Sequence, residues 1–284
     1  MRRTLAIIGA TALAATAAAC GAPSERAAED GGGDGDATTI TVGATPVPHA
    51  DVLNYIQENL AADAGLNIEV TEFTDYNQPN TALVEGSLDA NYFQTVPFME
   101  DFLEGNPDAD LTYVGDVHLE AFGLYSQKVG DVGELGDGAQ VGVPNDAANM
   151  GRALKLLEDQ GLLTLAEDSG DNPSEDDIED NPKDLDIVPT EAAQLPRSLP
   201  DLDAAAINGN YAIEAKVADG AEALAFEETE GNPYANGLVV RSEDADDEAV
   251  ATLDELLHSD EVKQYMEEQW DGVVIPVEGD GGQG

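Results

Sequence analysis

Arg152 is the side chain in this sequence best suited to hold an anionic group. Its guanidinium stays charged at physiological pH and offers two parallel N–H donors to a carboxylate. The residue falls near the start of a helix predicted at 149–160, just after a predicted strand, and ligands of open α/β sheets tend to lie at such strand ends. A structural ion pair with one of the many acidic side chains would use the same chemistry. Residue type alone leaves both interpretations open.

Four asparagines can each offer a hydrogen-bond donor and an acceptor, which suits a small ligand that carries both charges. They are Asn149, Asn208, Asn210 and Asn236. Asn210 competes with Asn208 for one role, since both lie in the polar cluster that follows a predicted strand. Asparagine in loops also satisfies local turns, so turn formation is the alternative for all four.

Residues for covalent or metal chemistry are few. The sequence has no Gly-x-Ser-x-Gly elbow, and its single cysteine, Cys20, lies close to the N-terminus. The histidines are His49, His118 and His258, and no two of them form a metal-binding pair at helical spacing. The acidic run at 167–180 lacks the alternating ligands and central glycine of a calcium loop. We therefore expect a binding protein without catalytic residues, metal or cofactor.

The charge balance is extreme, with 59 acidic and 11 basic side chains. Nucleic acid is excluded as a partner, because phosphate binding needs a basic surface. Much of the acid falls in polar runs, which predicts a solvated surface that keeps the protein soluble. Such a surface suits a high-salt habitat, where screening shortens the reach of self-repulsion to a few Å.

Residues 1–20 are typical of a lipoprotein signal peptide. Arg2 and Arg3 are followed by an alanine-rich apolar stretch at 5–18, and small residues precede Cys20. This stretch is shorter than the ~20 strongly apolar residues of a spanning helix. We expect Cys20 to carry the lipid, palmitate included, and to anchor the mature chain to the cell membrane on its extracytoplasmic face. The general and the twin-arginine export routes both remain open.

The rest of the chain predicts an α/β protein with two lobes. Residues 21–38 are too polar and glycine-rich to order themselves by burial, and residues 278–284 resemble them. Between these segments, strand-type and helix-type patterns alternate, which favours largely parallel sheets. Strands are predicted at 40–43, 67–73, 90–93, 140–144, 185–188, 204–207 and 237–241, and helices at 50–64, 78–86, 149–160 and 249–269.

Two successive α/β units indicate a first lobe at 39–123 and 238–277 and a second at 124–237. If the last helix packs on the first lobe, the chain crosses between lobes near 122–125 and near 236–240. Two crossings predict a hinged inter-lobe cleft, and such clefts are common ligand sites.

Blocks along nearly the whole body resemble the methionine-binding lipoproteins of ABC importers, the NlpA-type family. They occur in family order, which is more specific than any single short motif. The blocks lie at 42–50, 72–83, 88–94, 144–154, 191–199, 207–212 and 273–276.

The resemblance implies a two-lobed periplasmic-binding architecture and a lipid-anchored receptor that is not an enzyme. Such a receptor binds methionine, or a close relative, in the cleft and delivers it to an importer. Its partners would be a membrane permease and an ATP-hydrolysing subunit, and the receptor itself would be a monomer.

The resemblance also assigns roles at the site. Arg152 and the four asparagines would bind the carboxylate and ammonium groups of the amino acid. Tyr76, Tyr92 and Phe93 would supply aromatic surface for the ligand sulfur. His49 falls in a family block and would have a structural or cleft-edge role.

Two positions depart from the family pattern. Thr95 stands where the family usually has a histidine, and Phe98 where it has a tyrosine. Both changes remove hydrogen-bonding reach at the pocket edge. A different small amino acid or a methionine-containing peptide is therefore an alternative ligand, and an enzyme on the same scaffold is the alternative of another class.

Overall fold

The computed structural model describes residues 37–277. The predicted signal peptide with Cys20, the predicted linker up to residue 36 and the tail at 278–284 lie outside the described residues.

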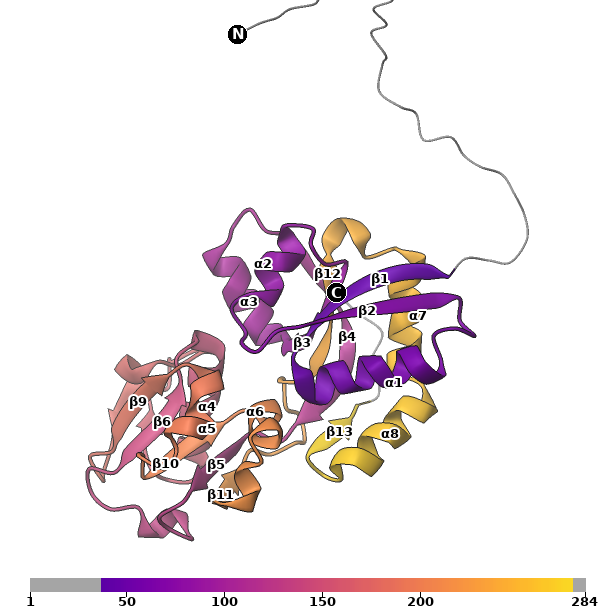
Figure 1. The fold of residues 1–284 in the computed structure, drawn as a ribbon. Coiled ribbons are helices and arrows are strands. Elements are labelled where there is room, and N and C mark those ends of the chain that lie inside the picture. The colour runs from indigo at the N-terminus through magenta and orange to yellow at the C-terminus, as the bar shows by residue number, and fades with distance from the viewer. Residues whose placement is uncertain (1–36, 278–284) are drawn as a thin grey trace, which may run out of the picture. The chain divides into compact units, whose positions relative to one another are not determined.

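A mixed six-stranded sheet forms the first lobe, in the order β13-β4-β12-β3-β1-β2 (Figure 1). Its strands are β1 (Thr38–Ala44), β2 (Leu66–Glu72), β3 (Ala90–Thr95), β4 (Leu111–Glu120), β12 (Asn236–Arg241) and β13 (Val274–Pro276). Strand β1 pairs in parallel with β2 and β3, and β12 lies antiparallel between β3 and β4.

Helices cover both faces of this sheet because its strands are apolar on both faces. The helices are α1 (Asp51–Asn59), α2 (Pro79–Val84), α3 (Val96–Gly105), α7 (Glu248–Leu257) and α8 (Asp260–Trp270). Side chains alternate along β12: Leu238 and Val240 join the core formed with α1, α7 and α8, whereas Val239 joins the core with α2 and α3. Burying each such side chain contributes about 1.5–3 kcal/mol.

A five-stranded sheet forms the second lobe, in the order β11-β5-β10-β6-β9. Its strands are β5 (Gly123–Ser126), β6 (Gln140–Pro144), β9 (Asp186–Thr190), β10 (Ala204–Ile207) and β11 (Glu222–Phe226), and its helices are α4 (Ala147–Asp159), α5 (Leu195–Ser198) and α6 (Gly209–Glu214). Along β10, Ala204 and Ala206 pack in the core with α4, and Ala205 and Ile207 in the core with α5 and α6.

Smaller elements complete the fold. Strands β7 (Thr164–Leu165) and β8 (Ile178–Asp180) pair antiparallel, and short helical turns lie at Pro46–Ala50, Val132–Glu134, Glu175–Asp177, Ala192–Gln194, Val217–Asp219 and Ser242–Asp244.

The chain passes twice between the sheets. Strand β4 of the first sheet is followed at once by β5 of the second, and segment 227–235 leads from β11 back to β12. The two-lobed α/β architecture predicted from the sequence is confirmed.

The prediction of largely parallel sheets is wrong. The two main sheets contain four parallel strand pairings and five antiparallel ones. The first strand after each crossing, β5 or β12, is antiparallel to both of its neighbours, because it enters the sheet from the other lobe.

Several helix bounds also differ from the prediction. The helix predicted at 50–64 ends at Asn59, and the one predicted at 249–269 is two helices, because Ser259 caps the start of α8 by accepting a hydrogen bond from the Val262 amide. Helix α3 and strand β4 were not predicted. No helix among residues 37–277 has the length and apolar character to cross a membrane.

Candidate functional site

A polar cavity is lined by residues of both lobes. Each lining residue lies at or just beyond the end of a strand, at the start of a helix, or in the loop between β2 and α2. The lining residues are Tyr76, Phe93, Gln94, Thr95, Phe98, Glu120, Asn149, Arg152, Asn208 and Asn236.

Arg152 reaches the cavity from the second turn of α4, whose first turn Asp146 caps by accepting a hydrogen bond from the Asn149 amide. The Arg152 guanidinium lies 4.6 Å from the ring centres of both Phe122 and Tyr234, an arrangement that favours a cation. Both aromatic residues lie on the segments that cross between the lobes. Arg152 is thereby fixed at the junction of the two lobes.

The Arg152 guanidinium also makes a bidentate ion pair with Glu227. Its Nε donates to Glu227 at 2.8 Å, and Nη2 donates to the other carboxylate oxygen and to the Glu120 backbone carbonyl. Among the described residues, the hydrogen bonds of Arg152 use Nε and Nη2 and leave Nη1 for another acceptor. The structural ion pair that the sequence left as an alternative is therefore present. It leaves Nη1 of the guanidinium available to a ligand.

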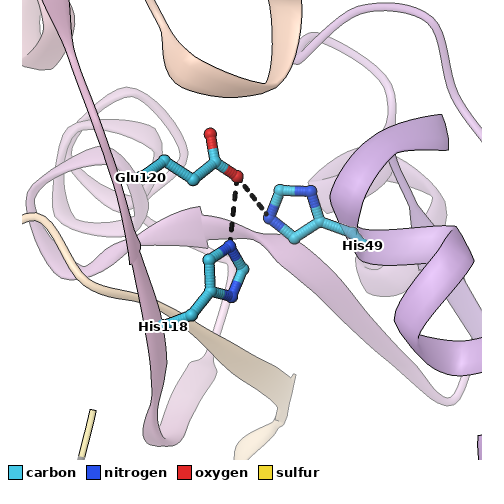
Figure 2. A group of neighbouring side chains, drawn as sticks. All are labelled: His49, His118 and Glu120. Atoms are coloured by element: carbon cyan, nitrogen blue, oxygen red, sulfur yellow. Dashed lines mark hydrogen bonds and ion pairs between the residues drawn. The ribbon is translucent and has the colours of Figure 1, made fainter. Parts of the chain in front are cut away.

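Glu120 at the end of β4 brings a buried carboxylate to the cavity, with only 4% of its surface exposed. Its Oε1 lies 3.3 Å from His49 Nε2 and 3.2 Å from His118 Nε2 (Figure 2). Its Oε2 accepts a hydrogen bond of 2.7 Å from the Asn210 backbone amide. A side chain at Gly209 would place its Cβ 2.7 Å from the Glu120 Cβ, so glycine is what permits this close approach.

The electrostatics favour an ionised Glu120 beside a neutral His49. Burial lowers the pKa of His49 to about 4, although the Glu120 charge opposes this shift. Burial would raise the pKa of Glu120, but His49, His118 and the Asn210 amide together outweigh it and the pKa is lowered. The hydrogen-bond partner of His49 Nε2 is Asn236 Oδ1, at 3.1 Å, whereas His118 Nε2 hydrogen-bonds to Glu120 Oε1.

Hydroxyl groups lie at the Nδ1 atoms of both imidazoles, the nitrogens that do not face Glu120. His49 Nδ1 lies 2.7 Å from Thr45 Oγ1, and His118 Nδ1 lies 2.5 Å from the Tyr92 hydroxyl. If both hydroxyls donate, both histidines carry their proton on Nε2, which faces Glu120. This assignment satisfies the network with one negative charge at Glu120.

Asn208 presents an acceptor that the described residues leave unused. Its Nδ2 donates to Asn149 Oδ1 at 2.8 Å, and Asn149 Nδ2 in turn donates to Asp146. Asn208 Oδ1 is buried and has no hydrogen-bond partner. An unpaired buried acceptor costs about 1–3 kcal/mol, and a ligand that donates a hydrogen bond would recover this cost.

An aromatic wall faces these polar groups. The rings of Tyr76, Phe93 and Phe98 lie 5.6–5.8 Å apart in pairs. The Tyr76 hydroxyl donates to Asn210 Oδ1 at 2.6 Å, and this bond joins the first lobe to the second. The cavity thus combines a cation, an anion and an apolar surface.

Seven of the nine residues predicted from the sequence to bind ligand line this cavity. They are Tyr76, Phe93, Thr95, Asn149, Arg152, Asn208 and Asn236. Tyr92 does not line it, because its hydroxyl is engaged with His118 Nδ1 in the core of the first lobe. Asn210 does not line the cavity either, but its side chain accepts a hydrogen bond from Tyr76 and its backbone amide donates to Glu120.

Sequence reasoning missed Gln94 and Glu120 as lining residues and treated Phe98 only as a departure from the family pattern. Gln94 is buried and hydrogen-bonds to Asn80 and Asn91. Glu120 and His118 stand two residues apart in β4, a spacing that places both on one face of a strand, and this signal was available in the sequence.

The fold and the cavity define the class: a two-lobed substrate-binding protein of the periplasmic type. Residues 40–278 match the family model described as NlpA lipoprotein, and the chain belongs to that family. The family resemblance found in the sequence is thus confirmed.

Three relatives illustrate the similarity. The methionine-binding lipoprotein MetQ of Bacillus subtilis (strain 168) is 38% identical over 276 residues, which cover 92% of this chain and 93% of the relative. The D-methionine-binding lipoprotein MetQ of Escherichia coli (strain K12) is 34% identical and covers 84% of this chain and 89% of its own length. The solved structure of a nutrient binding protein from Burkholderia cenocepacia bound to methionine has 38% identity and a TM-score of 0.81, over 84% of this chain and 100% of that one.

Proposed function

We propose that this chain is the extracytoplasmic receptor of an ABC importer and binds methionine or a close relative between its lobes. The observation that carries the proposal is that Arg152 and Glu120 bring opposite charges to one cavity. A free amino acid needs a cationic and an anionic partner at one end and space for its side chain at the other. Residues of both lobes line the cavity, with the two charged groups beside the aromatic side chains of Tyr76, Phe93 and Phe98.

In this proposal, the ligand carboxylate binds to Nη1 of Arg152. The ammonium group of the ligand binds to the Glu120 carboxylate and to Asn208 Oδ1, the buried acceptor that has no hydrogen-bond partner. Asn149 and Asn236 border the same space and orient the two charged groups. Charge-assisted hydrogen bonds of this kind are about twice as strong as neutral ones.

The side chain of the ligand would lie against Tyr76, Phe93 and Phe98. A thioether makes favourable contacts with aromatic rings, at about 0.3–1.5 kcal/mol each, whereas a carboxylate there would lose its hydration without a partner. Thr95 lines the same region, and its hydroxyl caps α3 at Phe98, so it offers less reach than the family histidine. This chemistry supports methionine ahead of leucine, glutamine and aspartate.

The remaining parts of the proposal concern partners and location. A lipid on Cys20 would hold the receptor at the membrane as a monomer, and a permease with its ATPase subunit would receive the ligand. The lobes would comprise 39–123 with 238–277, and 124–237. In this role the chain captures its ligand without chemical conversion.

Calorimetry on the full chain in detergent tests the ligand assignment. We expect one methionine to bind per chain, more tightly than leucine, glutamine or aspartate, with no turnover. If methionine does not bind but another amino acid does, and that binding depends on Arg152, the receptor class stands and the methionine assignment is wrong.

The anchor has its own test, the substitution Cys20→Ser. We expect the variant to be released from membranes or to remain unprocessed, because no helix among residues 37–277 can hold it in the bilayer. Membrane fractionation and the mass of the processed chain provide the measurement. A processed variant that stays in the membrane fraction at the wild-type level contradicts a lipid anchor on Cys20.

The aromatic wall is tested by Phe93→Ala. We expect methionine affinity to fall roughly tenfold, because an aromatic contact with the thioether and buried apolar area are both lost. Alanine as a ligand should be nearly unaffected, since its side chain is too short to reach the wall. Phe102→Ala is the matched control, because Phe102 packs in the core beneath α3 and does not line the cavity. Equal losses for methionine and alanine would contradict a side-chain slot at Phe93.

A further inference from the structure

Three metal-ligand side chains meet beside the cavity. His49 comes from the turn at Pro46–Ala50, and His118 and Glu120 come from one face of β4. One ligand atom from each residue lies within 4.8 Å of the other two, and all three residues are buried (Figure 2). We propose that His49 Nε2, His118 Nε2 and Glu120 Oε1 form a binding site for a divalent transition metal ion of the zinc type.

The two distances from Glu120 fit a metal polyhedron, and the imidazole nitrogens lie within 4.8 Å of each other. Charge-assisted N–H···O bonds are usually about 2.7–2.9 Å long, but Glu120 Oε1 lies 3.3 Å and 3.2 Å from the two imidazole nitrogens. With metal–ligand bonds of about 2.0–2.1 Å, neighbouring ligands of a tetrahedral ion lie about 3.3 Å apart. The other oxygen of the same carboxylate accepts from the Asn210 amide at 2.7 Å, a normal hydrogen bond.

The surroundings of the imidazoles suit a metal as well. A histidine that binds a metal through one nitrogen usually donates the proton on the other to an oxygen. Thr45 Oγ1 and the Tyr92 hydroxyl already stand at the Nδ1 atoms, and a hydroxyl can accept as well as donate. When a metal takes the Nε2 lone pair, the imidazole proton therefore moves to Nδ1 and keeps a partner.

The ligand set also selects the type of ion. Two imidazoles and one carboxylate form a typical zinc set with one position open, whereas Mg²⁺ and Ca²⁺ prefer oxygen ligands. Glu120 lines the cavity, so an ion bound to it would lie beside the cavity. Asn236 Oδ1 stands on the same side, 3.1 Å from His49 Nε2.

A metal at this site and a ligand ammonium group would compete for Glu120. The site itself does not rest on the proposed amino-acid function, and its test is done without any amino acid. Failure of the metal site and failure of the receptor proposal are therefore distinguishable.

The test titrates the metal-free full chain with Zn²⁺ in a calorimeter, in the presence of excess Ca²⁺ to occupy the acidic surface. We expect one Zn²⁺ per chain, and Co²⁺ in its place should give the visible absorption of a tetrahedral centre. Glu120→Gln and His49→Gln should each weaken Zn²⁺ binding on the order of 100-fold or more. Losing a residue that only hydrogen-bonds to a metal ligand typically costs about 10–100-fold in metal affinity, and losing the metal ligand itself should cost more. His258→Gln is the control, because His258 lies at the end of α7 and hydrogen-bonds to the Asp116 carbonyl instead.

Two results would overturn the site. One is the absence of stoichiometric Zn²⁺ binding to the wild-type chain, and the other is binding that Glu120→Gln leaves unchanged. Circular dichroism shows whether each variant folds. X-ray absorption at the zinc edge of the wild-type complex decides independently of any variant, since the site requires two imidazole ligands.

Discussion

The substitution Arg152→Ala should weaken the binding of every amino acid by about 2–5 kcal/mol, or roughly 30-fold to several thousand-fold. All amino acids share the carboxylate that Arg152 would bind, so methionine and leucine should lose affinity together. Their relative preference should persist, because the aromatic wall is unchanged. Calorimetry with both ligands measures the two effects.

The ion pair between Arg152 and Glu227 requires a matched control. Arg152→Ala alone leaves the partly buried Glu227 without its partner, which destabilises the fold whether or not ligand binds Arg152. The double variant Arg152→Ala with Glu227→Gln removes that charge and should recover much of the lost Tm. If affinity stays low while Tm recovers, Arg152 contacts the ligand. If affinity recovers with Tm, the role of Arg152 is only the structural ion pair.

The parts of the site that could be predicted from sequence are those whose signal is local. Asn208 follows a four-residue apolar strand, β10, and Arg152 lies near the start of an amphipathic helix after β6, so both positions follow from pattern alone. The carboxyl ends of these neighbouring parallel strands meet at one sheet edge, which is why the two residues converge.

The missed partners depend on contacts distant in sequence. Glu227 is one acid in a polar stretch of a very acidic chain, and only the path of the second crossing brings it to Arg152. Strand β4 lacks an uninterrupted apolar run, and it forms because β12 returns from the other lobe to pair with it. Glu120 lies at the end of that strand, so the two-residue spacing from His118 becomes informative only once the crossing establishes the strand.

The sequence could not show which of Tyr92 and Phe93 lines the cavity. The family block identifies both aromatic residues, but only Phe93 lines the cavity, whereas Tyr92 hydrogen-bonds to His118. Which one does so depends on the side of the sheet where His118 lies. That is a property of β4, not of the local sequence.

Glu120→Gln should weaken methionine binding by about 2–3 kcal/mol, roughly 30–150-fold, because the buried negative charge facing the ligand ammonium group is lost. The amide is nearly isosteric with the carboxylate, but one of its ends can only donate. If its oxygen accepts from His49 and His118, its nitrogen must face the Asn210 amide, another donor. Some loss of Tm is therefore expected as well.

A ligand without the amino group separates the charge effect from this structural loss. 4-(Methylthio)butanoic acid keeps the carboxylate and the thioether but has no ammonium group. In the presence of a chelator that removes metal ions, its affinity should be low and nearly equal for the wild-type chain and for Glu120→Gln. Methionine should discriminate strongly between the two proteins, because only methionine has the group that the Glu120 charge attracts. Equal losses for both ligands would mean that Glu120 shapes the cavity without contacting the ammonium group.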